Sequence, residues 1–268
     1  MLHALSDERP RRDPDRAVRV GPSSIDGFAS CQLKWALTKA GGDGPMIGQR
    51  DIGTLIHEIA AEGDTDAATM RAALDERWPR LGLPAGWSTD LKRREAGRML
   101  DRLARFFDEN TASGWRRLAA EESMRVELGR VVLSGTVDRL DVGPDGAVRV
   151  IDYKTGSSKP KGADVPRHAQ LGSYQLAVEA GAFEHLDVAP ESAGAALLHL
   201  GKAAGVATSI QVQPPLGDDE DPAWAERLVL ETGEGMAGTT FTATPSDDIC
   251  RTCPVRSSCP AQPEGRAL

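Results

Sequence analysis

The order of elements predicted from this sequence is that of an α/β protein: helices first, then several strands, then a helix and further strands. Two patterns support this prediction. Apolar side chains recur at helical spacing over residues 66–112, and β-branched, apolar runs recur between residues 123 and 200. The chain has 268 residues, of which 40% are hydrophobic, and this is enough for one core. No internal repeat is present.

The composition is acidic, with a formal net charge of −8 at pH 7. Nucleic-acid-binding proteins are usually basic, so the charge of the whole chain counts against DNA as a ligand. However, an acidic segment such as 218–221 can mask a local basic groove, and Lys159-Pro160-Lys161 is one local basic stretch. No apolar run reaches membrane-spanning length and the N-terminus is charged, so we expect a cytoplasmic protein.

The N-terminal part begins with a segment that we expect to be disordered, residues 1–20, because it is rich in Arg, Asp and Pro. A helix is predicted to start near Ser23, a suitable N-cap. Cys31 and Trp35 lie four residues apart on this helix and therefore on one side of it.

A second helix is predicted over residues 52–60, with an apolar stripe and His57 beside it. A single histidine next to an apolar face is more often a packing residue than a metal ligand. Residues 66–112 follow as two helices with a break at 79–86, and their apolar stripe indicates packing alone.

The centre of the chain is predicted to be a hairpin. Residues 131–138 form a β-branched strand, residues 142–146 are dense in turn residues, and residues 148–154 form the second strand. A further strand is expected at 123–128, before the hairpin.

The hairpin carries two carboxylates and a lysine, Asp138, Asp152 and Lys154. Side chains alternate along a strand, so Asp152 and Lys154 share one face and Tyr153 points to the other. Carboxylates can hold Mg²⁺ or Mn²⁺, and a lysine can stabilise developing negative charge, so this set suits phosphodiester hydrolysis. Taken alone, the pattern also fits a solvated polar pair at the end of a hairpin.

A Lys/Pro/Gly loop and a helix over residues 168–178 follow the hairpin. Gln170 and Tyr174 are four residues apart on one face of this helix, where they form either part of a site or an ordinary surface pair. Two more strands are predicted at 195–200 and 207–212, and a helix at 222–236.

The four cysteines occur as one distant residue and one cluster: Cys31, then Cys250-x-x-Cys253-x5-Cys259. In a cytosolic chain, four cysteines favour a metal site over disulfides. Zinc usually takes two close pairs, whereas four thiolates also suit a [4Fe–4S] cluster. The spacing alone leaves zinc and iron–sulfur open.

Together these residues resemble the PD-(D/E)XK nucleases of the RecB type. The cysteine pattern resembles the iron–sulfur branch of that group, as in AddB. A narrower likeness, over residues 22–35 and 167–181, is to the C-terminal nuclease domains of actinobacterial AdnAB-type helicase–nucleases; one departure is Gln32, where that family commonly has Pro. The motifs that carry the resemblance are His57 on a helix, Gly135-x-x-Asp138, Asp152-Tyr153-Lys154 and Gln170-x-x-x-Tyr174.

The resemblance implies a restriction-endonuclease-like core, a mixed central sheet flanked by helices. Residues 21–268 would form one nuclease domain: a helical region at 21–120, a catalytic core at 121–215, and a C-terminal helix with a cysteine-rich iron–sulfur tail at 216–268.

The resemblance also implies a role for each site residue. His57, Asp138, Asp152 and the backbone carbonyl of Tyr153 would bind Mg²⁺ or Mn²⁺. Lys154 would be the catalytic lysine, positioned together with the DNA strand by Gln170 and Tyr174. Cys31, Cys250, Cys253 and Cys259 would hold a structural [4Fe–4S] cluster, with zinc as the alternative.

We therefore predict a metal-dependent deoxyribonuclease, an exonuclease on single-stranded DNA or duplex ends, acting in DNA repair and recombination. A metal-activated water would attack phosphorus in line while the metal and Lys154 stabilise the added charge. The sequence has no G-x-x-x-x-G-K-[ST] phosphate loop, so a superfamily 1 helicase motor would be a separate partner. The alternatives are a catalytically silent DNA-binding or scaffold module on the same fold and a zinc-stapled protein of unrelated function.

Overall fold

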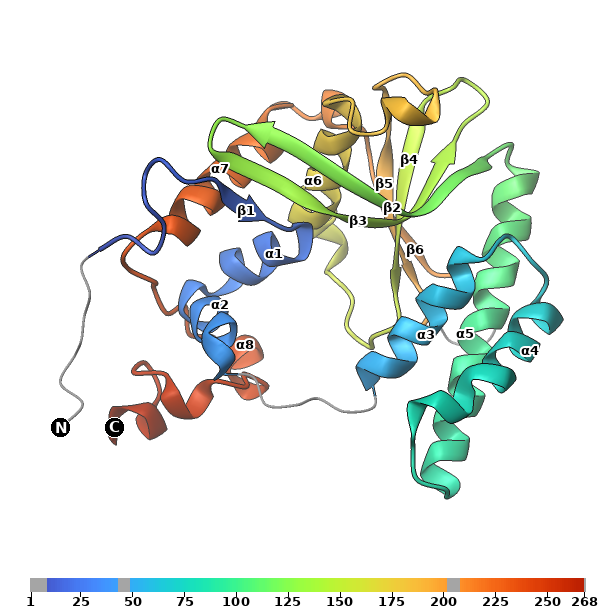
Figure 1. Ribbon diagram of the computed structural model, residues 1–268, viewed down its shortest axis with the longest axis horizontal. Helices are drawn as coiled ribbons and strands as arrows, with labels where there is room; N and C mark the ends of the chain where they lie inside the picture. Colours follow the sequence, from blue (N-terminus) through green and yellow to red (C-terminus); the bar gives the residue numbers. More distant parts are fainter. Residues whose placement is uncertain (1–8, 43–48, 202–207, 268) are drawn as a thin grey trace. The chain divides into compact units, whose positions relative to one another are not determined.

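The computed structural model describes residues 9–42, 49–201 and 208–267. The chain divides into two compact units, each assembled from separate segments (Figure 1). The first unit contains Met1–Pro45, Arg125–Gly135 and Ala223–Leu268, and the second contains Met46–Met124 and Thr136–Pro222.

The strands form a mixed six-stranded sheet in the order β1-β3-β4-β5-β6, with β2 pairing with β3. β1 runs parallel to the start of β3, β3 and β4 form an antiparallel hairpin, β5 runs parallel to β4, and β6 runs antiparallel to β5. The predicted α/β class and mixed sheet are thereby confirmed. The strands are β1 (Val18–Val20), β2 (Arg116–Leu128), β3 (Val131–Val142), β4 (Val148–Lys154), β5 (Ser192–His199) and β6 (Ile210–Gln213).

In the first unit, the helix Trp224–Ala237 packs against β1 and against the helix Pro22–Ser30. The helices of this unit are α1 (Pro22–Ser30), α2 (Gln32–Leu37), η1 (Thr38–Gly42), α7 (Trp224–Ala237), α8 (Asp247–Arg251), η6 (Arg256–Ser258) and η7 (Pro263–Ala267). α7 approaches β3 closely at Gly233, where an added Cβ would lie 2.6 Å from a methyl carbon of Val131. Glycine is therefore what lets this helix pack at this distance.

Two predictions for the first unit need correction. The segment 1–20 was expected to be disordered, yet residues 18–20 form β1, because their backbone pairs with Val131–Leu133 and the side chains of Val18 and Val20 are buried. Residues 1–8 lie outside the described residues. The helix predicted to carry both Cys31 and Trp35 is interrupted at Cys31, whose backbone is extended (φ −166°) and which caps α2.

The second unit places helices on both faces of its strands. One layer consists of α3 (Gln49–Ala61), α4 (Ala67–Arg77) and α5 (Trp87–Ala112), which contact one another and share a core with Ile151, Tyr153 and Leu198 (Figure 1). α6 (Ala169–Glu179) contacts β4 and β5, and its side chains meet Asp152 and Lys154. The predicted alternation of β4 is therefore confirmed. Short turns complete the unit: η2 (Trp78–Leu81), η3 (Gly162–Asp164), η4 (Glu184–Leu186) and η5 (Leu216–Asp218).

The predicted elements of the second unit are largely present. The break between α4 and α5 and the helix after the hairpin lie where they were predicted. Two strands are longer: β2 starts at Arg116 instead of residue 123, and β3 continues past Asp138 to Val142. Among the described helices, none combines the length and the apolar character that a membrane crossing requires.

Candidate active site

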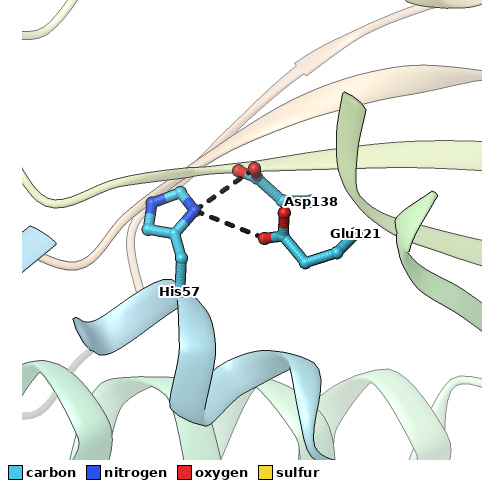
Figure 2. Close-up of side chains that lie close together, drawn as sticks. All are labelled: His57, Glu121 and Asp138. Carbon is cyan, nitrogen blue, oxygen red and sulfur yellow. Dashed lines mark hydrogen bonds and ion pairs between the residues drawn. The ribbon is translucent and has the colours of Figure 1, made fainter. Parts of the chain in front are cut away.

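Three side chains of the second unit, His57, Glu121 and Asp138, converge from α3, β2 and β3 (Figure 2). The Nδ1 atom of His57 lies 3.2 Å from Oδ1 of Asp138 and 3.9 Å from Oε1 of Glu121. One potential ligand atom from each residue lies within 4.8 Å of the other two, and of the described residues only these three form such a group. One imidazole and two carboxylates are a donor set suited to a divalent cation.

The elements that carry this group hold its side chains in place. Ile52 and Ile56 bury the apolar face of α3, which leaves His57 half-buried at the edge of that face. The His57 ring packs edge-on against Tyr153, with ring centroids 5.8 Å apart. The second oxygen of Asp138 accepts a hydrogen bond of 2.5 Å from the backbone N–H of Tyr153, so β4 fixes the orientation of this carboxylate.

Glu121 was not identified from the sequence. It has a left-handed backbone conformation (φ 49°), which is unfavourable for a residue with a Cβ. No motif marks it: the only signal is the acidic pair Glu121-Glu122 inside a strand. Backbone strain of this kind persists where the surrounding structure imposes it, and it is frequent at functional sites.

A second group connects the end of β4 to α6. Lys154 Nζ lies 2.8 Å from Oδ2 of Asp152 and donates a hydrogen bond of 2.8 Å to Oε1 of Gln170. Gln170 Nε2 donates to Oδ1 of Asp152 (2.7 Å) and to the hydroxyl of Tyr174 (2.9 Å), and that hydroxyl in turn donates to Oδ1 of Asp152 (3.1 Å). The four side chains form one network, so Gln170 and Tyr174 are not an ordinary surface pair.

The pKa values of this region are shifted by burial and by neighbouring charge. Burial, then the charge of Asp138, raises the pKa of Asp152 to about 6, although Lys154 opposes the shift. Burial lowers the pKa of His57, but the hydrogen bond and charge of Asp138 outweigh this effect and raise it overall. Burial and Asp138 also raise the pKa of Glu121. Besides burial, the negative charge of neighbouring carboxylates contributes to each shift, and a bound cation would offset that part.

The buried Oδ2 atom of Asp152 is a further indication that the residues fit a cation. Lys154 Nζ lies 2.8 Å from it, and no other described group donates a hydrogen bond to it. A carboxylate oxygen can accept more than one bond, so this buried atom can take a further positive partner. The donor set of His57, Glu121 and Asp138 therefore suits Mg²⁺ or Mn²⁺.

The four cysteines gather within the first unit. All four are free thiols and line one cavity: Cys31, Cys250, Cys253 and Cys259. The Sγ atom of Cys31 lies 3.5 Å from the backbone nitrogens of Lys34 and Thr244, and Gln262 Nε2 lies 3.4 Å from the Sγ atom of Cys250. Four thiols around one cavity are a donor set that suits either a zinc ion or an iron–sulfur cluster.

The sequence also matches a family model described as the PD-(D/E)XK nuclease superfamily, over residues 19–260. The chain belongs to this superfamily. Its nucleases are usually hydrolytic and typically use Mg²⁺ or Mn²⁺, and a nuclease domain implies DNA binding. No curated protein matches the sequence.

Two solved structures are similar to this chain. One is SSO0001, with 14% sequence identity and a TM-score of 0.40. The match covers 94% of this chain and 88% of SSO0001. The other is a protein from Eubacterium rectale described as "Putative exonuclease", with 13% sequence identity and a TM-score of 0.49. The match covers 94% of this chain and 93% of the Eubacterium rectale protein.

Proposed function

We propose that the protein is a metal-dependent deoxyribonuclease, an exonuclease acting on single-stranded DNA or duplex ends. The observation that supports this most strongly is the arrangement in the second unit: His57, Glu121 and Asp138 within ligand distance of one another, and an Asp152–Lys154 pair on the adjoining strand. Membership of the PD-(D/E)XK nuclease superfamily agrees with it.

The proposal assigns a role to each group. His57, Glu121, Asp138 and Asp152 hold Mg²⁺ or Mn²⁺, with the Tyr153 carbonyl as a further ligand. The bound metal supplies Lewis acidity toward the scissile phosphate and activates a water.

Lys154 stabilises the negative charge that develops on the phosphate, because its ammonium group already lies beside Asp152. Gln170 and Tyr174 position Asp152 and Lys154 from α6. Gln170 also orients the lysine through its amide oxygen.

The cysteine cavity supports a second part of the proposal. We infer that Cys31, Cys250, Cys253 and Cys259 hold a structural [4Fe–4S] cluster, with zinc as the alternative, as in the AddB-like branch of RecB-type nucleases. In that case residues 21–268 act as one nuclease domain. This domain would process DNA ends during repair, as AdnAB-type enzymes do. Its partner would be a superfamily 1 helicase.

A cleavage assay tests the nuclease activity directly. End-labelled single- and double-stranded DNA are incubated with the protein in Mg²⁺ and in Mn²⁺, beside Asp138→Ala, Asp152→Ala and Lys154→Ala. Asp108→Ala, at an exposed position of α5, serves as the matched control. The native protein and Asp108→Ala should cleave, whereas each of the three site variants should lose at least about 100-fold in rate, as for removal of one electrostatic catalytic group.

The same assay distinguishes the rival function. A native protein that binds DNA but does not cleave it in either metal would be a catalytically silent DNA-binding or scaffold module. Cleavage that persists in all three site variants would show that the reaction takes place elsewhere in the chain.

A further inference from the structure

A pocket in the first unit is lined by cationic and neutral side chains. It has a volume of about 430 Å³, and its cations come from three places: the segment before β1, β1 itself and the turn after α2. The lining residues are Arg11, Arg12, Ala17, Val18, Arg19, Ser24, Trp35, Lys39 and Met236. Four of them are cations and none is an acid, in a chain whose net charge is −8.

The cations are held close to one another by the fold. The backbone N–H groups of Arg11 and Arg12 donate hydrogen bonds to Gly238 (3.2 Å) and Ala237 (3.3 Å), at the C-terminal end of α7. Arg19 projects from the exposed side of β1, which is fixed by the burial of its two neighbours in the strand. Like charges brought together in this way repel one another unless an anion lies between them.

Two carboxylates close to the pocket in the chain, Asp13 and Glu234, are engaged with other partners. Asp13 forms an exposed ion pair with Arg16 at 3.9 Å. Glu234 on α7 pairs with Arg130, whose guanidinium also donates to backbone carbonyls of the segment before β1. Within the described residues, the side chains of Arg12, Arg19 and Lys39 form no ion pair.

Trp35 forms part of a rigid aromatic wall of the pocket. Its ring packs against Phe28 (5.2 Å between centroids) and Phe241 (5.9 Å), and the Arg11 guanidinium lies 4.8 Å from its centre. The ring is buried and its face carries Arg11, so a base has no free face on which to stack. The chemistry of the pocket thus favours phosphate groups over bases.

We propose that this pocket binds the phosphate backbone of the DNA strand, independently of its sequence, as a site additional to the metal-binding residues. Arginine forks match phosphate oxygens in two-point hydrogen bonds, lysine adds a point charge, and Ser24 can donate one further hydrogen bond. The pocket brings together more positive charge than one free phosphate would balance, whereas a strand supplies successive phosphates. The inference rests on the proposed function, since that function makes DNA the polyanion that this chain meets.

The test measures binding of a fluorescein-labelled oligodeoxynucleotide by anisotropy over a range of salt concentrations. An Asp152→Asn background without added Mg²⁺ or Mn²⁺ prevents cleavage. The pocket variant is Arg12→Ala/Arg19→Ala/Lys39→Ala. The matched control, Arg80→Ala/Lys92→Ala/Arg94→Ala, removes the same charge from exposed positions of the second unit.

The pocket variant should bind about tenfold more weakly, and the slope of log K against log [salt] should become shallower by about 2, since each lost contact with a single strand contributes about 0.7. The variant Arg12→Lys/Arg19→Lys, with Lys39 unchanged, keeps the positive charge. Its salt slope should therefore lie close to that of the unaltered pocket. If the pocket variant fails to fold, Arg12→Ala and Arg19→Ala alone should each reduce the slope by about 0.7. Equal effects of the pocket and control variants would overturn the inference, because they would reflect net charge alone.

The result is separable from the proposed nuclease activity. In the otherwise native chain, the pocket variant should raise KM and leave kcat unchanged, because the metal-binding side chains are intact. A protein that never cleaves DNA, but loses binding in the pocket variant, would refute the nuclease function and retain this site. Normal cleavage with unchanged KM and unchanged binding would refute the site alone.

Discussion

Glu121 combines two features at the scale of a single residue. Its backbone has φ 49°, and its carboxylate lies beside His57 and Asp138. A left-handed conformation costs a non-glycine residue about 1–2 kcal/mol. Partial burial and the charge of Asp138 raise the pKa of its carboxyl group, so the charged form is less favourable here than in water. Backbone strain and neighbouring charge therefore both disfavour Glu121 in the metal-free fold, as expected of a residue whose role is to bind a cation.

Substitutions at Glu121 should separate these two features. Glu121→Gln keeps the strain and removes the charge, so Mg²⁺ and Mn²⁺ affinity should fall at least about tenfold. Glu121→Gly should lose the same affinity but raise the melting temperature of the metal-free protein, because glycine adopts positive φ without a steric cost. Calorimetric metal titration and thermal melts provide the two readouts. Unchanged affinity in both variants would remove Glu121 from the metal site.

The raised pKa values predict how metal binding depends on pH. Asp152 has a pKa of about 6 and His57 a pKa above its ordinary 6.5, so both hold protons at pH 5 and lose them as the pH rises above these values. Metal binding requires deprotonated ligands, so the stabilisation conferred by Mg²⁺ should be large at pH 8 and absent at pH 5. Without metal the sign is opposite: the folded state binds these protons more tightly than the unfolded chain, so they stabilise the fold at low pH and this contribution is lost as the pH rises.

Melting temperatures at several pH values, with and without Mg²⁺, check this prediction. Asp152→Asn is the control: an amide does not titrate, so this variant should reduce the pH dependence of the metal effect to the part that His57 contributes. An effect of Mg²⁺ that is the same at pH 5 and pH 8 would contradict the assignment of these groups as ligands.

At the scale of elements, the packing of α7 on β3 depends on one glycine. A Cβ at Gly233 would lie 2.6 Å and 2.7 Å from the two methyl carbons of Val131, closer than real contacts allow. By contrast, a Cβ at Gly97 on α5 would meet only Arg71 side-chain atoms at 3.8 Å, an ordinary contact. The two glycines thus lie in helices with opposite tolerance for a methyl group.

Gly233→Ala and Gly97→Ala should therefore have opposite effects on stability. Gly233→Ala should destabilise the fold by about 1–3 kcal/mol, the cost of overpacking. Gly97→Ala should stabilise it by about 0.5–1 kcal/mol, because alanine loses less backbone entropy in a helix. Denaturant unfolding of both variants measures the difference, and a Gly233→Ala protein as stable as Gly97→Ala would show that α7 does not approach β3 this closely.

At the scale of the whole molecule, spacing predicted local arrangements, whereas arrangements between distant residues were predicted only where the family resemblance supplied them. The hairpin that carries Asp138 and Asp152 was predictable because its strands and turn are adjacent in sequence, and Gln170 and Tyr174 because helical spacing places them together. β1 was missed because three residues become a strand only through pairing with β3, more than one hundred residues away. Glu121 was missed because its position beside His57 depends on how β2 is placed in the fold.

The four cysteines come from chain segments of the first unit that are far apart in the sequence. This unit is assembled from three chain segments, and Cys31 lies in the first of them while Cys250, Cys253 and Cys259 lie in the last. Cys31 and Cys250 are more than two hundred residues apart. A cluster held by all four would close a loop of that length, and a loop of ~100 residues closed by a disulfide is already estimated at roughly 4.7 kcal/mol. Cluster binding would add its own free energy to folding.

Cys31→Ser and Cys253→Ser should therefore lower the melting temperature and the iron content to a similar extent, despite their distance in sequence. Serine at position 31 is a good N-cap and replaces the cap that Cys31 gives to α2, so a loss of stability there reports ligand loss and not loss of the cap. Absorbance near ~400 nm and iron and zinc analysis identify the bound group, since thiolate-to-iron charge transfer gives a brown protein and zinc gives a colourless one. A Cys31→Ser protein that stays brown, keeps its full iron content and melts at the native temperature would show that the cluster does not use Cys31, and that the first and last segments are held together by packing alone.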